Sequence, residues 1–418
     1  MRALKWMLLL GLGFCFQSIA VAGESRIWTS RKGSTLEAEL LKADATSATL
    51  VTKEAKQIIL KIEDLSLGDR QFLVEYGNAD PKILVAGELG EPEKQVRIDS
   101  ATIKKLKESN LTLGEESVSL FELTESEHFL VASAGKVRAE AIAETAERLW
   151  HGMAFQHMNF RRDWADKRML IFLAEDRPAY AALGKWYTDS LSAAGQQDGA
   201  ERVRATWDKL GSTSISLPEE MTKAHNLHSQ AILFNILDAS KFKKEMGPFQ
   251  IHTIAGALLT KQLGGVSSFG SEGYFAVTTG HSYFKEISLG GKSETQILSV
   301  QGTSNEEIIS KKGFEDGTSW VRGLKTAVRK GTVKVELEPM LQWTVDGLKP
   351  EQLVLIYSFS YYMQSTPQRL CAFAAMVRRI ESSNQIPPAV EIAKIFGFDS
   401  VQAFNADWEL FIKEGNFK

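Results

Sequence analysis

The chain has 418 residues, 44% of them hydrophobic, and a formal net charge of -3 from 49 basic and 52 acidic side chains. This length exceeds one ordinary domain, and the apolar content is enough for a sizeable core. Because both charge signs are interspersed, the chain offers no basic patch for a phosphate backbone, and we expect no nucleic acid partner.

Residues 1–22 have the pattern of a secretory signal peptide. Arg2 and Lys5 precede an apolar run from Met7 to Phe16, and Ala20-Val21-Ala22 is a small-residue cleavage site. No later run reaches the roughly 18 apolar residues that a membrane helix needs. We therefore expect a bacterial protein that is exported to the periplasm or secreted, with no membrane span in the mature chain.

Residues 24–75 contain short strands about ten residues apart. The strand patterns are 27–29, 36–41, 47–52 and 57–62, and a helical tail follows. This spacing predicts a small all-β barrel. Trp28 has two interpretations, an exposed contact for a peptide or a core residue, and the second is favoured because large aromatic side chains are mostly buried.

Two strings in this region, Arg26-Ile27-Trp28-Thr29 and the closing segment from Leu65 to Leu73, resemble the Sla-one homology domain. The resemblance implies an SH3-like barrel and, more weakly, binding of a peptide or protein, with Trp28 as a contact. The endocytic role of the eukaryotic family cannot apply behind a bacterial-type signal peptide.

Residues 76–124 are mixed in pattern and are interpreted as a linker with some structure, with a turn signal at Asn78-Ala79-Asp80-Pro81. From residue 125 the pattern alternates. Strands are expected at 127–132, 169–173 and 231–237, with helices at 137–156 and 178–186. This order predicts an α+β domain over residues 125–415.

The stretch His252-Thr253-Ile254-Ala255-Gly256 lies on an apolar helix expected over 248–263, and Ser271-Glu272-Gly273 follows. In the H-E-x-x-H motif two histidines one helical turn apart bind zinc, and the glutamate between them is the general base. Here the base position is Thr253 and the second histidine position is Gly256. Loss of the base alone typically costs about 100-fold to 10,000-fold in rate.

These residues resemble the gluzincin-type, peptidase-MA-like metallopeptidases. The resemblance implies that His252 matches the first zinc ligand and Glu272 the third, with Phe269 where the family usually has tryptophan. It also implies one long helix over 357–380 and a terminal helix around Phe404 to Trp408. The second domain is thus expected to be zincin-like and degenerate.

An alternative is a rearranged zinc site. His252 and Glu272 supply two of the three protein ligands that catalytic zinc requires, and His225 or His228 could complete the set if the strand after them borders the helix. His281 is a poor candidate because helical spacing places it opposite Glu272. A structural histidine is the favoured interpretation for all three.

Other nucleophiles are not supported, because Cys371 lies in an apolar stretch and Ser271 has no histidine paired with it. The sequence thus predicts a multidomain pseudoenzyme without a cofactor, an SH3-like barrel followed by an α+β zincin-like domain. Its expected function is adaptor-like binding of a protein or peptide, through Trp28 or the vestigial cleft of His252, Thr253, Gly256 and Glu272. The alternatives are a zinc metallopeptidase with rearranged ligands and a structural cell-envelope protein.

Overall fold

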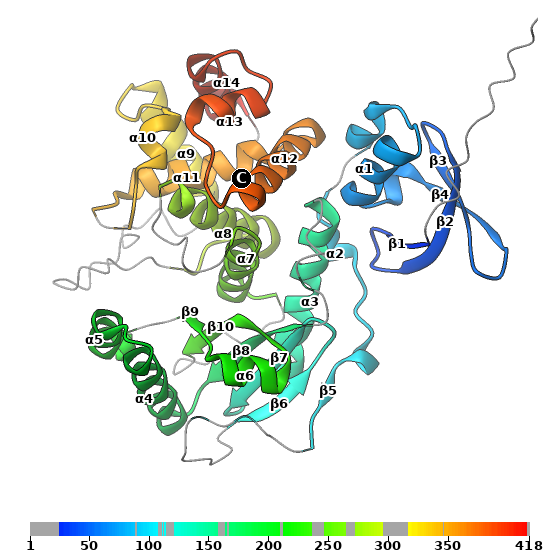
Figure 1. The fold of residues 1–418 in the computed structure, drawn as a ribbon. Helices are drawn as coiled ribbons and strands as arrows, with labels where there is room; N and C mark the ends of the chain where they lie inside the picture. Colours follow the sequence, from blue (N-terminus) through cyan, green and yellow to red (C-terminus); the bar gives the residue numbers. More distant parts are fainter. Residues whose placement is uncertain are drawn as a thin grey trace, which may run out of the picture.

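The computed structural model describes residues 25–415, except 88–89, 108–110, 112, 114–120, 158–163, 165–166, 210–211, 236–245, 265–271, 296–316 and 346. The expected signal peptide, Phe269 and Ser271 lie outside the described residues. The fold is α+β, with two separate sheets and many helices (Figure 1). None of the described helices is long and apolar enough to cross a membrane.

The first sheet is antiparallel and has four strands in the order β1-β2-β3-β4. The elements are β1 (Arg26–Thr29), β2 (Thr35–Ala43), β3 (Ser47–Val51), β4 (Gln57–Lys61), η1 (Ile62–Asp64) and α1 (Leu67–Tyr76). The described strands form no closed barrel, because β1 does not pair with β4 and only Ser30 bridges to Leu65. The prediction of a small all-β unit is therefore confirmed only as an open antiparallel sheet with one helix.

Trp28 lies in the core of this unit and is only 1% exposed. Its Nε1 donates to the carbonyl oxygen of Ala38 at 3.0 Å, and its ring meets the ring of Phe72 edge-on. Because the indole is buried and its one donor is used, the structure places Trp28 in the core and not on the surface where a peptide would bind.

The second sheet is mixed and has six strands in the order β5-β6-β7-β8-β10-β9. Its strands are β5 (Lys104–Lys105), β6 (Glu122–Glu125), β7 (Phe129–Ala134), β8 (Arg168–Ala174), β9 (Ser212–Ser216) and β10 (Leu227–Asn235). The central strands β7, β8 and β10 are parallel, whereas β5, β6 and β9 pair antiparallel with their neighbours.

Both faces of the central strands are covered. On β8, Ile171 faces the core that contains α3 and α7, whereas Phe172 faces the core that contains α4 and α6. The covering helices are α3 (Ala139–Gln156), α4 (Arg177–Ala193), α6 (Glu219–His225) and α7 (Pro248–Gln262), with α5 (Gln197–Thr206) and η5 (Trp207–Lys209) beside α4. Strands buried on both faces are apolar throughout. The buried strand expected at 169–173 is confirmed as part of β8, where these five residues are all buried.

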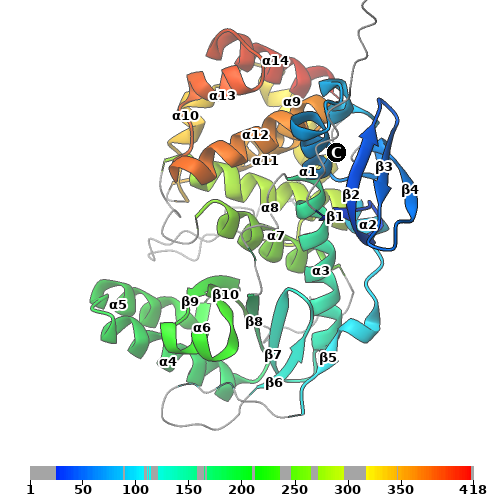
Figure 2. The same ribbon diagram turned by 45° about the vertical axis from the view of Figure 1, so that its right-hand side comes forward.

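A layer of helices lies beyond the mixed sheet, and α7 lies between the sheet and α8, the first helix of this layer (Figures 1 and 2). The layer contains α8 (Tyr274–Gly290), α9 (Gly317–Arg329), α10 (Leu337–Leu341), α11 (Pro350–Met363), α12 (Pro367–Ser383), α13 (Ala389–Ile395) and α14 (Val401–Glu414). In α14, Phe404 and Trp408 are fully buried, as their helical spacing predicts.

The expectation of one long helix over 357–380 is wrong, because the structure has two helices, α11 and α12, in this range. Pro367 begins α12, and the Thr366 side chain accepts a hydrogen bond from the backbone nitrogen of Arg369 as its N-cap. A residue before proline is disfavoured in the helical region, so the chain breaks at Thr366.

The segment interpreted as a linker carries η2 (Pro81–Val85), α2 (Pro92–Gln95), η3 (Ser100–Thr102) and β5. Glu93 of α2 is fully buried and accepts a hydrogen bond from Lys285 Nζ of α8 at 2.5 Å. A second contact joins α12 to η2, where Cys371 Sγ donates to the carbonyl oxygen of Leu84 at 3.4 Å. The segment thus packs against the C-terminal helices, and the division into domains stays a prediction.

Candidate functional site

The candidate site is built on two antiparallel helices, α7 and α8. Pro248 opens α7 after Gly247, whose backbone nitrogen donates to the Gln250 side chain at 3.3 Å. At one end of the pair, Tyr274 Oη donates to the carbonyl oxygen of Leu263 at 3.0 Å. At the other end, His252 meets Glu286. This register decides which residues of α8 face the motif on α7.

His252 is held by a buried carboxylate. Its Nδ1 donates to Glu286 Oε2 at 2.9 Å, and its ring lies edge-on to Tyr283 with centroids 4.4 Å apart. Glu286 is fully buried and also accepts hydrogen bonds from Ser293 Oγ, from the Thr295 hydroxyl and from the backbone nitrogens of residues 294 and 295. A carboxylate that holds a histidine in this way resembles the outer shell of metal sites, where it orients the ring without binding the metal.

Thr253 stands at the position of the general base. Its Oγ1 lies 3.0 Å from Ser212 Oγ on β9, the edge strand of the mixed sheet. A hydroxyl does not accept a proton from metal-bound water near neutral pH. The contact instead joins the motif helix to the sheet edge through two neutral side chains.

Gly256 stands at the position of the second histidine and is packed closely against α8. A Cβ atom at this position would lie 2.4 Å from Ser282 Oγ and 3.6 Å from Ser282 Cβ. Ser282 Oγ donates to the carbonyl oxygen of Thr278 at 2.9 Å, which fixes its direction. The close approach of the two helices therefore depends on glycine, and a histidine ring does not fit here unless Ser282 changes.

We predict that Gly256→Ala destabilises the protein, because overpacking in a core costs about 1 to 3 kcal/mol. Gly256→Ala combined with Ser282→Ala removes the clashing hydroxyl and should restore the free energy of unfolding. Urea denaturation followed by circular dichroism measures both, with Ser282→Ala alone as the control. A single Gly256→Ala variant as stable as the parent would contradict the close packing.

Glu272 is not brought to His252. It is exposed, lies just before α8 and accepts a hydrogen bond from Gln342 Nε2. At 1.5 Å per residue, Tyr274 at the start of α8 is about 18 Å along the helix from Glu286, the residue that meets His252. The alternative ligand pair of His252 and Glu272 is thus not assembled, and the described residues contain no group of three or more candidate metal ligands.

The remaining candidate histidines also lie elsewhere. His228 is buried against Trp164, with ring centroids 4.6 Å apart, and burial with help from Lys261 lowers its pKa to about 3. Lys261 is at the C-terminal end of α7, about 13 Å along the helix from His252. His225, at the end of α6, is half-buried. The geometry therefore gives no support for either as a third ligand at His252.

His281 belongs to a different buried cluster. Its ring lies 5.7 Å from that of His157 and stacks on Phe373 at 6.0 Å. Burial lowers the pKa of His157 to about 3 and that of His281 well below its usual value, and Lys285 acts in the same direction. Both imidazoles are therefore neutral, structural groups at neutral pH.

No family model, curated protein or solved structure matches this chain. The interpretation of the site therefore depends on its own geometry.

Cys371 is half-buried and burial raises the pKa of its thiol to about 11, so it is a poor nucleophile.

Sequence reasoning missed Glu286, the residue that decides the environment of His252. Lys285 and Glu286 are adjacent opposite charges, a pair that usually indicates an exposed helix face. In the structure both are buried and each has a partner on a different element. The apolar residues on either side, Phe284 and Ile287, were the local signal that could have indicated burial.

Proposed function

We propose that this chain is an exported, non-catalytic protein-binding protein, in which an SH3-like domain precedes a degenerate, gluzincin-like scaffold. The SH3-like assignment is supported by the antiparallel order of β1 to β4, the short η1 turn after β4 and the bridge from Ser30 to Leu65. The scaffold assignment is supported by the motif helix α7 lying beside an antiparallel edge strand, β9.

The observation that carries the proposal is the use of all three motif positions in packing. His252 is bound by Glu286, Thr253 contacts Ser212, and Gly256 is in close contact with Ser282. A catalytic zinc needs three ligands and a base for its water. At these positions the chain offers one imidazole, one hydroxyl and one glycine, so the residues do not fit a catalytic zinc ion.

The partner is proposed to be an extended peptide segment that adds to the outer edge of β9, which pairs with no further strand among the described residues. Leu217 donates its backbone N–H to the carbonyl oxygen of Ser229 in β10, and the N–H of Ser216 points the other way, to the Tyr187 hydroxyl. Because successive N–H groups alternate along a strand, that of Ser214 also points away from β10. An exposed strand edge is a common template for peptide binding.

The first test addresses metal and catalysis. We predict substoichiometric zinc in the purified mature protein by elemental analysis, and no cleavage of an unfolded protein such as casein. One tightly bound zinc ion per chain that is lost in His252→Ala, together with cleavage, would favour the alternative of a metallopeptidase with rearranged ligands.

Rebuilding the motif gives a positive control for the scaffold. The triple variant Thr253→Glu, Gly256→His and Ser282→Ala supplies the second imidazole and the base, and removes the hydroxyl that blocks position 256. We expect it to bind zinc more tightly than Ser282→Ala alone, measured by competition with a chromogenic chelator. A folded triple variant without zinc affinity counts against the gluzincin-like scaffold.

The second test addresses binding at β9. Ser214→Pro removes an outward N–H without removing a hydrogen bond to β10, whereas Ser214→Ala keeps the N–H and is the matched control. On an array of random-sequence peptides, Ser214→Pro should lose signal and Ser214→Ala should not. A folded parent protein that binds no peptide would instead favour the structural envelope protein.

A further inference from the structure

We propose that a cavity formed by the start of α8, by α10 and by the connection between α12 and α13 binds a basic peptide segment. The cavity has a volume of about 940 Å³. It is separate from β9 and from His252, so this proposal does not depend on the peptide binding proposed at β9. It gives Glu272 a role that its position in the motif does not suggest.

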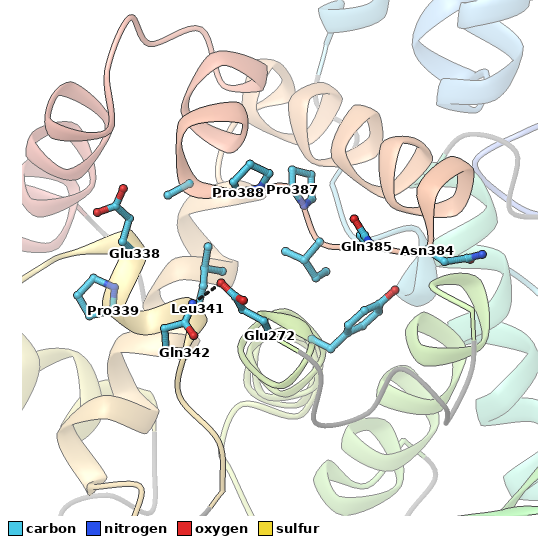
Figure 3. A pocket seen from close by; sticks show the side chains of 12 residues that line it. Glu272, Glu338, Pro339, Leu341, Gln342, Asn384, Gln385, Pro387 and Pro388 are labelled. Atoms are coloured by element: carbon cyan, nitrogen blue, oxygen red, sulfur yellow. Dashed lines mark hydrogen bonds between the residues drawn. The ribbon is translucent and has the colours of Figure 1, made fainter.

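The charge of the cavity selects a cation. Glu272 and Glu338 both line it, and the lining residues that the structure describes include no lysine, arginine or histidine. Both carboxylates are exposed; Glu272 accepts a hydrogen bond from Gln342, and neither carboxylate forms an ion pair with a described residue. In Figure 3, Glu338 lies at the left of the view and Glu272 below the centre, and Pro387 and Pro388 lie above Glu272. A cationic side chain placed here would form charge-assisted hydrogen bonds.

The cavity floor is held in a defined shape. Gly273 has a positive φ of 79° and donates its N–H to the carbonyl oxygen of Leu341 at 2.7 Å, which joins α8 to α10. A Cβ atom on Gly273 would lie 2.8 Å from the Ile386 side chain. Glycine at this position thus allows the connection after α12 to approach α8 closely.

The opposite wall is also fixed. Asn384 ends α12 in the left-handed conformation, and Pro387 and Pro388 restrict the backbone that follows. Arg379 of α12 forms two contacts with Glu391 of α13, at 2.6 and 3.3 Å, and so holds the two helices together across the connection. A wall that is ordered before binding reduces the entropy lost on binding.

The chemistry of the lining suits a polypeptide more than a small cation. Asn384 and Gln385 present side-chain amides, which can pair with both the N–H and the C=O of a peptide backbone. The prolines and Ile386 offer apolar surface for the methylene stem of lysine or arginine. The volume is near the upper end of the roughly 300 to 1,000 Å³ of ligand pockets, which is more than a single cation fills.

The test measures binding of a fluorescein-labelled heptapeptide with two central lysines flanked by glycine and serine, by fluorescence anisotropy. The expected result is saturable binding that weakens as salt is raised, and no binding of the same peptide with glutamate in place of lysine. The double variant Glu272→Gln and Glu338→Gln should weaken binding by about tenfold or more. Glu220→Gln, at an exposed carboxylate on α6, is the matched control and should bind like the parent.

Other outcomes overturn the proposal. Equal affinity of the parent and the double Glu variant, or equal binding of the lysine and glutamate peptides, shows that the cavity carboxylates do not select the ligand. Binding of spermidine without binding of the lysine peptide assigns the cavity to polyamines. Loss of peptide binding in Ser214→Pro but not in the Glu variants assigns the peptide to β9, so failure at the two sites can be told apart.

Discussion

Lowering the pH from 7 to 5 is expected to remove about 4 kcal/mol from the free energy of unfolding through the two fully buried histidines His157 and His281, in addition to the loss through His228, whose pKa is also lowered to about 3. Burial lowers the pKa of His157 from 6.5 to about 3 and that of His281 well below 6.5. In the unfolded chain both take up protons as the pH falls through 6.5. The stabilisation is therefore complete above that pH and is lost progressively as the pH approaches the folded-state value.

The expected loss is a large fraction of the roughly 5 to 15 kcal/mol by which ordinary proteins are stable. Urea denaturation at a series of pH values measures it, and the slope of the unfolding free energy against pH counts the protons taken up on unfolding. His157→Leu should reduce that slope, because it removes one of the groups that take up a proton only on unfolding. A free energy of unfolding that is constant from pH 7 to pH 5 would show that the two imidazoles are not buried in neutral form.

Glu93→Gln is expected to destabilise the protein by about 3 to 5 kcal/mol, because it leaves the Lys285 ammonium buried without its counter-charge. Both side chains are almost completely buried, and Lys285 Nζ donates at 2.5 Å to Glu93 and at 2.7 Å to Gln156. Glu93 also packs closely against Gly152 of α3, where an added Cβ atom would overlap the Glu93 carboxyl group. Thermal and urea denaturation measure the loss.

The ion pair itself is expected to contribute little relative to an apolar pair. The double variant Glu93→Leu and Lys285→Met should therefore recover most of the stability lost in Glu93→Gln. Asp189→Asn, which breaks the exposed pair of Lys185 and Asp189 on α4, is the matched control and should have almost no effect. If Glu93→Gln is as stable as the parent, Glu93 does not neutralise Lys285 in the interior.

The elements that could be predicted from sequence are those with a local cause. The strand at 169–173 is a short continuous apolar run, and the helix over 248–263 is a longer apolar one. The residues of each element are therefore enough to predict it. The break before Pro367 was equally local, since a threonine N-cap and a proline mark it. The resemblance to a family with one long helix predicts the opposite, and the local signal of Thr366 and Pro367 prevails in the structure.

The candidate site could be predicted only in part, because its geometry depends on the register of α7 against α8. That register is set by the contact of Gly256 with Ser282 and by the pairing of His252 with Glu286, neither of which a local pattern reveals. The motif therefore identified the helix that carries His252, whereas the carboxylate that His252 meets is Glu286 and not Glu272. Glu272 lies at the far end of the pair, in a cavity that sequence could not indicate.

The contact between Glu93 and Lys285 also constrains the order in which the chain can fold. The two residues are 192 positions apart, so the buried pair can form only once α8 is available to α2. Until then α2 cannot take its final place beside α3, because its carboxylate would be buried alone. The N-terminal sheet can form early, but its attachment to the rest of the protein must wait for α8.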